Sequence, residues 1–265
     1  MHLLPLIPRK CTTNDLYLLL VVILIYKMKA EKSILKFGWY SSLAVVVLTI
    51  ITWGFAMIAV PPAGPYCPGD CMQYPFTDLL SYYPRDYYWM YLAIFQVFAY
   101  LLFMISNHFI ARVEQRVFGF SSVAFSIISA MILLCAYFIQ FSVVPISVMK
   151  GESEGIALLT QYNGHGIFIA MEELAFICMS ISFLFMAFVF STETRLEKAI
   201  RLIFLAAFPL IILAFSIYTA KFGIDRSYRF EVAAISVNWL VIISTGILIC
   251  FNIKKKMKAL NVTKA

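Results

Sequence analysis

The sequence is poor in charged residues. Only 13% of its 265 residues are Asp, Glu, Lys or Arg, while 62% are apolar, against about a quarter and about half in an ordinary soluble domain. So large a share of apolar side chains cannot be enclosed in one water-soluble core. The composition therefore excludes a soluble enzyme, a coiled coil, a disordered chain and a disulfide-packed secreted module.

The common motifs of catalysis and cofactor binding are also absent. The sequence has no P-loop, no glycine-rich nucleotide motif, no zincin helix and no G-x-S-x-G, which disfavours ATP-driven transport by this chain and the common hydrolases. The last apolar segment has no Lys for a retinal Schiff base, and the chain has only three His, too few at matching depth for haem ligation by two histidines. We therefore expect no catalytic residue set, no metal site and no cofactor.

What the sequence does contain is long apolar segments. A helix needs about 20 mostly apolar residues to cross the hydrocarbon core, and the segments are too apolar all round for a soluble helix. The predicted fold class is an all-α polytopic membrane bundle with six spans: Tyr40–Val60, Tyr87–Ala111, Ser121–Met149, Gly166–Phe190, Leu202–Ala220 and Glu231–Phe251. The chain then divides into an N-terminal segment (residues 1–39), the six-span domain (residues 40–251) and a basic tail (residues 252–265).

Basic residues between the spans predict the orientation. The net charge of +7 would suggest a nucleic-acid partner in a soluble chain, but here the Lys and Arg residues lie between apolar blocks, so we expect membrane lipids and no nucleic acid. Fourteen basic residues fall on the side of the termini and five on the other side. By the positive-inside rule both termini are cytoplasmic, and we expect an integral protein of a prokaryotic plasma membrane.

The beginning of the chain allows three interpretations. Leu16–Tyr26 is an apolar run of 11 residues, shorter than a span and close in length to the core of a signal peptide. It could be a signal-like or interfacial anchor, or a seventh span that also uses Leu3–Ile7. The third interpretation, which we favour, is that translation begins at Met28, because residues 28–36 read as a cytoplasmic start before the first span.

The longest loop, residues 61–86, contains six Pro and the run Cys-Pro-Gly-Asp-Cys. The prolines predict a stiff, irregular segment without regular helix. Because this loop is expected on the oxidising side of the membrane, a disulfide between Cys67 and Cys71 is plausible. Free thiols, or redox or metal chemistry, are the alternatives. The spacing does not match a thioredoxin-type CxxC.

Two adjacent acidic residues are the most informative feature of the spans. Of the 35 charged side chains, only Glu172 and Glu173 fall well inside a predicted span, about 9 to 10.5 Å below its outer end. A charged side chain at that depth costs at least about 2.5 kcal/mol and by default marks a functional site facing protein or water. Because no Lys or Arg lies inside a span, we expect at least one of the two to be protonated.

Other polar residues fall at similar depth, and they define the predicted site. By helical rise, Gln96 and Gln140 lie about 13.5 Å and Asn238 about 10.5 Å below the outer ends of their spans, with Trp53 and Thr52 nearby. His165 precedes Glu172 by seven residues, which places it on nearly the same helix face. We predict one outward-facing polar pocket formed by Glu172, Glu173, His165, Gln96, Gln140 and Asn238. Glu172 would be the coupling acid, and Glu173 would bond toward Gln140 or Asn238.

Three functional classes fit this pocket. The first is a transporter-like or ligand-binding membrane protein that takes up a proton, a cation or a small molecule through the glutamates. The second is a scaffold or accessory subunit in which the polar residues only hold helices together. The third is a lipid-modifying enzyme that uses the carboxyl groups and His165 as acid and base. The di-glutamate resembles that of CAAX-processing intramembrane proteases, but Ile177 replaces the Arg of their motif, so the sequence does not place the chain in that family.

Overall fold

The computed structural model describes residues 13–59 and 63–262, with the side chains of residues 13–28, 261 and 262 left out. Six of its helices are long and apolar enough to cross a membrane, and the described residues contain no strand. The predicted all-α class and the six spans are therefore confirmed. Six such helices are compatible with a multi-span membrane protein. The helices are α1 (Thr13–Ile58), α2 (Tyr88–Ile110), α3 (Arg116–Ser142), α4 (Val144–Met149), α5 (Ile156–Leu159), α6 (Ile167–Ala187), α7 (Arg195–Phe222) and α8 (Tyr228–Val262).

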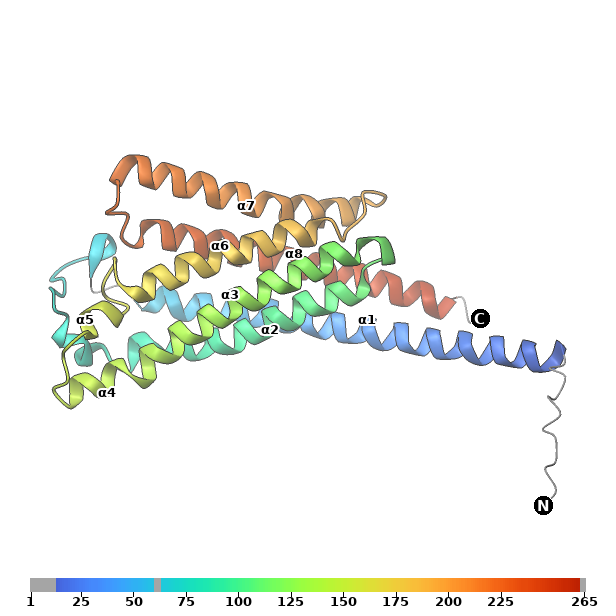
Figure 1. Ribbon diagram of the computed structural model, residues 1–265, viewed down its shortest axis with the longest axis horizontal. Coiled ribbons are helices and arrows are strands. Elements are labelled where there is room, and N and C mark those ends of the chain that lie inside the picture. The colour runs from blue at the N-terminus through green and yellow to red at the C-terminus, as the bar shows by residue number, and fades with distance from the viewer. Residues whose placement is uncertain (1–12, 60–62, 263–265) are drawn as a thin grey trace, which may run out of the picture.

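The long helices lie side by side in one elongated bundle (Figure 1). Helix α1 packs against α2 and α8, α3 packs against α2 and α6, and α6 contacts α8, which closes a ring of five helices. Helix α7 lies outside this ring against α6 and α8 (Figure 1). We call the end that carries residues 63–87, 143–166 and 223–227 the loop end, and the opposite end, where α1 begins and α8 ends, the terminal end.

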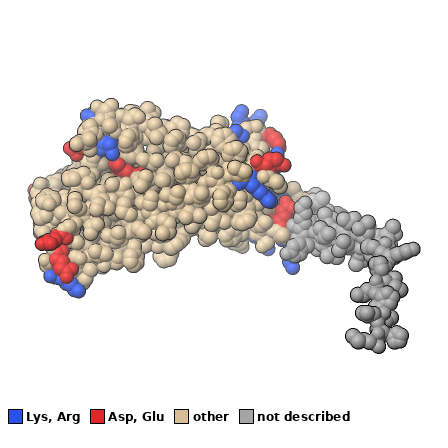
Figure 2. All heavy atoms as spheres, in the orientation of Figure 1, with Lys and Arg blue, Asp and Glu red and all other residues tan. Residues whose placement is uncertain are grey.

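The surface of the bundle shows the charge distribution of a membrane protein. Large apolar side chains are exposed along the outward faces of the long helices, Leu102 of α2, Met131 of α3 and Leu213 of α7 among them. On the face seen in Figure 2, acidic and basic atoms gather toward the two ends of the bundle. The assignment of the terminal end to the cytoplasm, and of the protein to a prokaryotic plasma membrane, stays a prediction.

Several helices continue past the ends of the predicted spans. Helix α1 begins at Thr13, so the apolar run Leu16–Tyr26 and the first span belong to one helix, and α8 continues through the basic residues to Val262. Lys, Met, Leu and Ala are good helix formers, so a helix does not stop where its apolar segment stops. Leu3–Ile7 lie outside the described residues, and a start of translation at Met28 stays a prediction, as do the segment boundaries 1–39 and 252–265.

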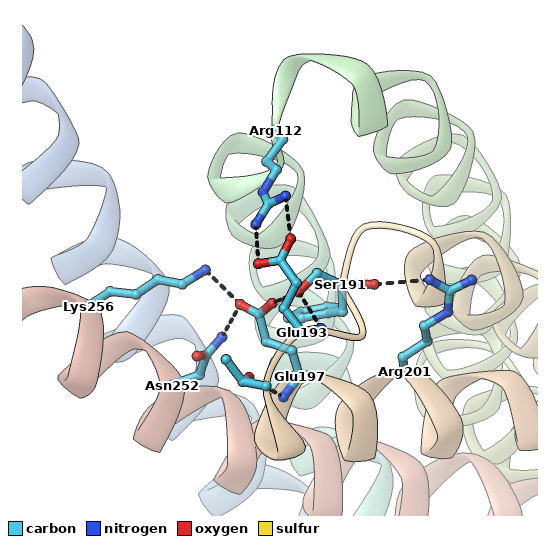
Figure 3. A network of polar contacts seen from close by, with 9 residues as sticks. Arg112, Ser191, Glu193, Glu197, Arg201, Asn252 and Lys256 are labelled. Carbon is cyan, nitrogen blue, oxygen red and sulfur yellow. Dashed lines mark hydrogen bonds and ion pairs between the residues drawn. The ribbon is translucent and has the colours of Figure 1, made fainter.

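The terminal end is held together by a network of polar contacts (Figure 3). Arg112, which follows α2, forms a bidentate ion pair with Glu193, in which both N–O distances are 3.1 Å. The Arg112 guanidinium holds the pKa of the Glu193 carboxyl below its usual range. On α7, the Glu197 carboxyl accepts hydrogen bonds from Lys256 (3.0 Å), Asn252 (3.3 Å) and the Ser191 hydroxyl. These contacts join three segments that lie far apart in the sequence: Arg112 after α2, residues 191–197, and the end of α8.

Helices α1 and α8 pack at short range where Gly246 faces α1. A Cβ atom at Gly246 would lie 2.5 Å from Val46 Cγ2 and 3.4 Å from the Ser42 carbonyl oxygen. Small residues let membrane helices pack at such short range. This contact sets the distance between α1 and α8, and so it helps to position the parts of both helices that lie toward the loop end.

Substitution of Gly246 should force α1 and α8 apart. We expect Gly246→Val to destabilise the folded protein by about 1 to 3 kcal/mol, the usual range for overpacking, as measured by reversible unfolding in mixed SDS micelles. Gly54 on α1 is the matched control, because an added Cβ there meets nothing within 4 Å. Equal stability of the Gly246→Val and Gly54→Val variants would contradict the close approach.

Candidate functional site: a pocket at the loop end

A pocket of about 320 Å³ lies between α1, α2, α6 and α8 near the loop end of the bundle. Its lining combines three Trp (53, 89, 239), three Tyr (66, 162, 228) and three acidic residues (Asp86, Glu172, Glu231), together with Gln161, Ser236, Phe168 and several aliphatic side chains. No Lys, Arg or His is among the described residues that line it. This volume lies at the lower limit of small-molecule sites, and its mixture of an apolar wall with a few polar groups is typical of them. We call it the loop-end pocket.

Two glutamates from different helices meet in the loop-end pocket. Glu172 of α6 is 1% exposed and Glu231 of α8 is 6% exposed, and both side chains line the pocket. The Glu172 Oε1 atom, however, has no hydrogen-bond donor among the described residues. Two buried carboxyl groups that line one pocket without a basic partner cannot both be charged at low cost, so we expect one of the two to carry a proton.

The third acidic residue, Asp86, is already partnered. Its Oδ1 atom lies 2.6 Å from Arg85 Nε, and its Oδ2 atom accepts a hydrogen bond of 3.4 Å from the Tyr162 hydroxyl. Burial raises the pKa of the Tyr162 hydroxyl, so this group keeps its proton and remains a donor. Asp86 is thereby neutralised from outside the pocket, because Arg85 is largely exposed.

Loops cover the pocket on the side of the loop end. The Tyr228 hydroxyl donates a 3.0 Å hydrogen bond to the Gln161 carbonyl oxygen, which joins α8 to the segment before α6. Gly64 has a φ of +74°, and a Cβ there would lie 2.3 Å from the Tyr228 ring. Only glycine meets both requirements. The disulfide between Cys67 and Cys71, with an S–S distance of 2.07 Å, lies in the same loop, which has three short 3₁₀ turns and no α-helix in residues 63–87.

Aromatic side chains form a large part of the lining of the pocket. Trp53 of α1 and Trp239 of α8 make an edge-to-face contact, with ring centroids 6.0 Å apart. Trp89 of α2 packs edge-to-face on Tyr137, with centroids 5.4 Å apart. The pocket therefore lies directly beyond the point where the rings of α1 and α8 meet, and three of the four Trp residues of the chain line it.

Glu173 does not belong to this pocket, which corrects one part of the predicted site. Its Oε2 atom lies 3.2 Å from Arg226 Nη2, and Glu173 is not among the residues that line the pocket. Its predicted bond toward Gln140 or Asn238 is wrong. The basic partner of Glu173 comes from outside the predicted spans, because Arg226 in the loop between α7 and α8 folds back onto α6.

The three predicted amides are buried, but they hold helices and loops rather than line the pocket. Gln96 Nε2 donates to Thr49 Oγ1 across the α2–α1 contact, at 3.3 Å. Gln140 donates to the Leu159 carbonyl oxygen and accepts from the Gln161 amide at 2.9 Å. Asn238 Nδ2 donates to the Phe176 carbonyl oxygen at 3.2 Å and to that of Ala234 at 2.8 Å. The single polar layer predicted around the glutamates is therefore not formed.

His165 also lies apart from Glu172. It is exposed and is not among the residues that line the pocket. Helix α6 begins at Ile167, after His165, so the helical spacing that placed His165 above Glu172 does not apply. Of the six residues predicted for the pocket, only Glu172 is among the residues that line it. Trp53, which was expected near the site at a similar depth, also lines the pocket.

Glu231 is the residue that sequence reasoning missed. The hydropathy pattern starts the last span at Glu231, but α8 begins one turn earlier, at Tyr228. Helical spacing places Glu231, Ile235 and Trp239 on one face of α8, and all three line the pocket, but the spacing alone does not show that this face meets Glu172.

Comparison of the chain with known family models, with curated proteins and with solved structures gives no match. The described residues also contain no group of three or more His, Cys, Asp and Glu side chains arranged to hold a metal ion. The chemistry of the site therefore has to be argued from the pocket itself.

Gln140 provides a prediction that separates structure from binding. Gln140→Leu removes two hydrogen bonds to the segment 159–161 and leaves its buried backbone groups without those partners, so we expect a loss of about 1 to 3 kcal/mol in unfolding free energy. The carboxyl pair is untouched, so carbodiimide labelling of Glu172 should persist. Loss of labelling in a variant that remains folded would show that Gln140 takes part in the site.

Proposed function

We propose that the protein is a membrane protein that binds a small ligand or a proton in the loop-end pocket through Glu172 and Glu231, in a transport-type or receptor-type role. The observation that carries the proposal is a pair of buried carboxyl groups that face the same pocket from two helices with no basic residue in the lining. Buried ionisable groups inside a membrane protein are costly, so they are retained where they bind something. Proton or cation uptake is the chemistry open to such a pair.

Carbodiimide labelling tests the proposal. Dicyclohexylcarbodiimide reacts with protonated carboxyl groups in apolar surroundings, so we expect mass spectrometry to find label on Glu172 or Glu231, decreasing as the pH rises. Glu231→Gln should alter the pH profile of labelling at Glu172, because it removes the second carboxyl group that competes with Glu172 for a proton in the same pocket. Glu154 lies exposed in the loop before α5 and should stay unlabelled. A folded protein with no label on either glutamate at any pH would contradict the proposal.

The rival function is that of a scaffold or accessory subunit, and a specific observation favours it: Gln96, Gln140 and Asn238 all bond between segments. Under that function the carboxyl pair is only another interhelical contact. Glu172→Gln would then lower stability and change nothing else. Under the binding function the same variant stays folded and loses its response to ligand or pH.

A further inference from the structure

We propose that the ligand of the loop-end pocket is an organic amine with an apolar body, whose ammonium group binds at the carboxyl groups of Glu172 and Glu231 and displaces a proton from them. This inference rests on the proposed function and names its ligand class. The exchange is balanced in charge: one ammonium ion enters the pocket and one proton leaves it. The argument has four parts, which concern charge, aromatic rings, access and the exclusion of metals.

The charge balance of the lining requires a cation. Asp86 is matched by Arg85 at 2.6 Å, and outside the pocket Glu173 is matched by Arg226 at 3.2 Å. Glu172 and Glu231 have no such partner among the residues that line the pocket. The other titratable groups near the pair are the phenols of Tyr66, Tyr137 and Tyr228, which are neutral at ordinary pH, and the Glu173 carboxylate, which is paired with Arg226. The pair is thus the one place in the lining where a positive charge is not already supplied by the chain.

The aromatic wall selects an organic cation. Three indole and three phenol rings line the same pocket as the pair. Ring faces attract ammonium groups, Trp most strongly, and aromatic cages are a common solution for binding alkylated ammonium ions. The same rings provide the apolar surface that buries a hydrocarbon body. A lining that combines two carboxyl groups with indole and phenol rings matches a molecule that has both an ammonium group and an apolar body.

Access from the lipid is consistent with an amphiphilic ligand. Met57 of α1 and Val232 of α8 both line the pocket, and they are 72% and 40% exposed on the surface of the bundle. Both residues belong to membrane-spanning helices. The pocket therefore reaches the apolar surface between α1 and α8, where an amine dissolved in the lipid layer can enter without crossing water.

The geometry disfavours a metal ion as the occupant. A divalent cation needs six or more oxygen ligands for Ca²⁺, or near-octahedral oxygens for Mg²⁺. In the described residues no three acidic, His or Cys side chains come together in that way. An ammonium ion needs only hydrogen-bond acceptors and ring faces, which the pocket has.

Three probes of one size and different charge test the ligand class: 2-phenylethylamine, 2-phenylethanol and phenylacetate. Binding is followed by tryptophan fluorescence of the full-length protein in detergent, since three of the four Trp residues line the pocket. We expect a saturable change with the amine and none with the alcohol or the acid. Calorimetric titration of the amine in phosphate and in Tris should give different binding enthalpies. For one proton released, they should differ by the difference between the ionisation enthalpies of the two buffers.

Variants tie the signal to the pair. Glu172→Gln and Glu231→Gln should each weaken amine binding at least about tenfold, since a hydrogen bond to a charged group contributes about 1.5 to 3 kcal/mol, while Glu154→Gln leaves it unchanged. If Glu172→Gln does not fold, Trp53→Leu, which removes one ring from the lining, should weaken binding of the amine by a similar factor.

The ligand class is overturned if the alcohol or the acid binds at least as tightly as the amine, or if the amine binds without release of a proton. In either case carbodiimide label on the pair leaves the proposed function standing. No probe response together with no label overturns both.

Discussion

We expect Arg226→Ala to lower the free energy of unfolding far more than most loop substitutions do. Arg226 forms the only ion pair that the described residues show for Glu173, with an N–O distance of 3.2 Å, and both side chains are largely buried. Removal of one partner leaves a carboxylate without compensation at the membrane, which costs about 3 kcal/mol or more for a buried pair. The guanidinium also lies 4.6 Å from the centre of the Phe215 ring, so a cation–π contact with α7 is lost as well.

A second substitution tests this explanation. The double variant Arg226→Ala with Glu173→Gln removes both charges, so it should recover most of the lost stability. Stability is measured by reversible unfolding in mixed SDS micelles, with Lys150→Ala in an exposed loop as the control. A double variant as unstable as Arg226→Ala alone would show that the loop between α7 and α8 needs Arg226 for a reason other than Glu173.

Glu231→Lys should abolish amine binding while it preserves the fold. The new ammonium group would lie in the pocket opposite Glu172 and take the place of the ligand's cation. A like charge in the site repels an incoming cation by several kcal/mol, so the affinity for 2-phenylethylamine should fall by about a hundredfold or more. The stability in the absence of ligand should equal or exceed that of the wild type, because an ion pair replaces two carboxyl groups.

Two controls isolate the position of the new charge. Glu154→Lys makes the same change of net charge on the exposed loop and should bind the amine like the wild type. Glu231→Gln, which removes an acid without adding a base, should give an intermediate affinity. Fluorescence titration with 2-phenylethylamine and unfolding in mixed micelles are the two measurements. A Glu231→Lys variant that binds the amine as tightly as the wild type would show that the ligand does not meet Glu231.

The spans were predictable because the physical constraint acts on each segment by itself. Lipid requires about 20 apolar residues in a row, and this property can be read from any one window of the sequence. The ends of α1 and α8 were not predictable in the same way, because hydropathy reports where lipid ends and not where the helix ends. Thr13 and Val262 lie well outside the predicted spans for this reason.

The site was predicted only in part, because it depends on contacts between helices. Glu172 was found from its depth alone. Its partner Glu231 lies 59 positions later in the sequence, and a single sequence contains no information on which faces of α6 and α8 meet. The role of Glu173 was mistaken for a related reason: Arg226 lies in a loop, and no local pattern shows that this loop folds back onto α6. His165 was misplaced because a helix was assumed to begin before Gly166.

The closure of the five-helix ring by α1 and α8 has a consequence for biosynthesis. The first helix cannot complete its packing until the last one is made, because α8 packs against α1. Helix α8 also supplies Glu231, Ser236 and Trp239 to the pocket. During synthesis the earlier helices enter without this neighbour, so Ser42 and Val46 lack the contact with Gly246 until α8 arrives. A nascent chain that is stopped in the loop before Tyr228 would hold five inserted helices and no binding pocket.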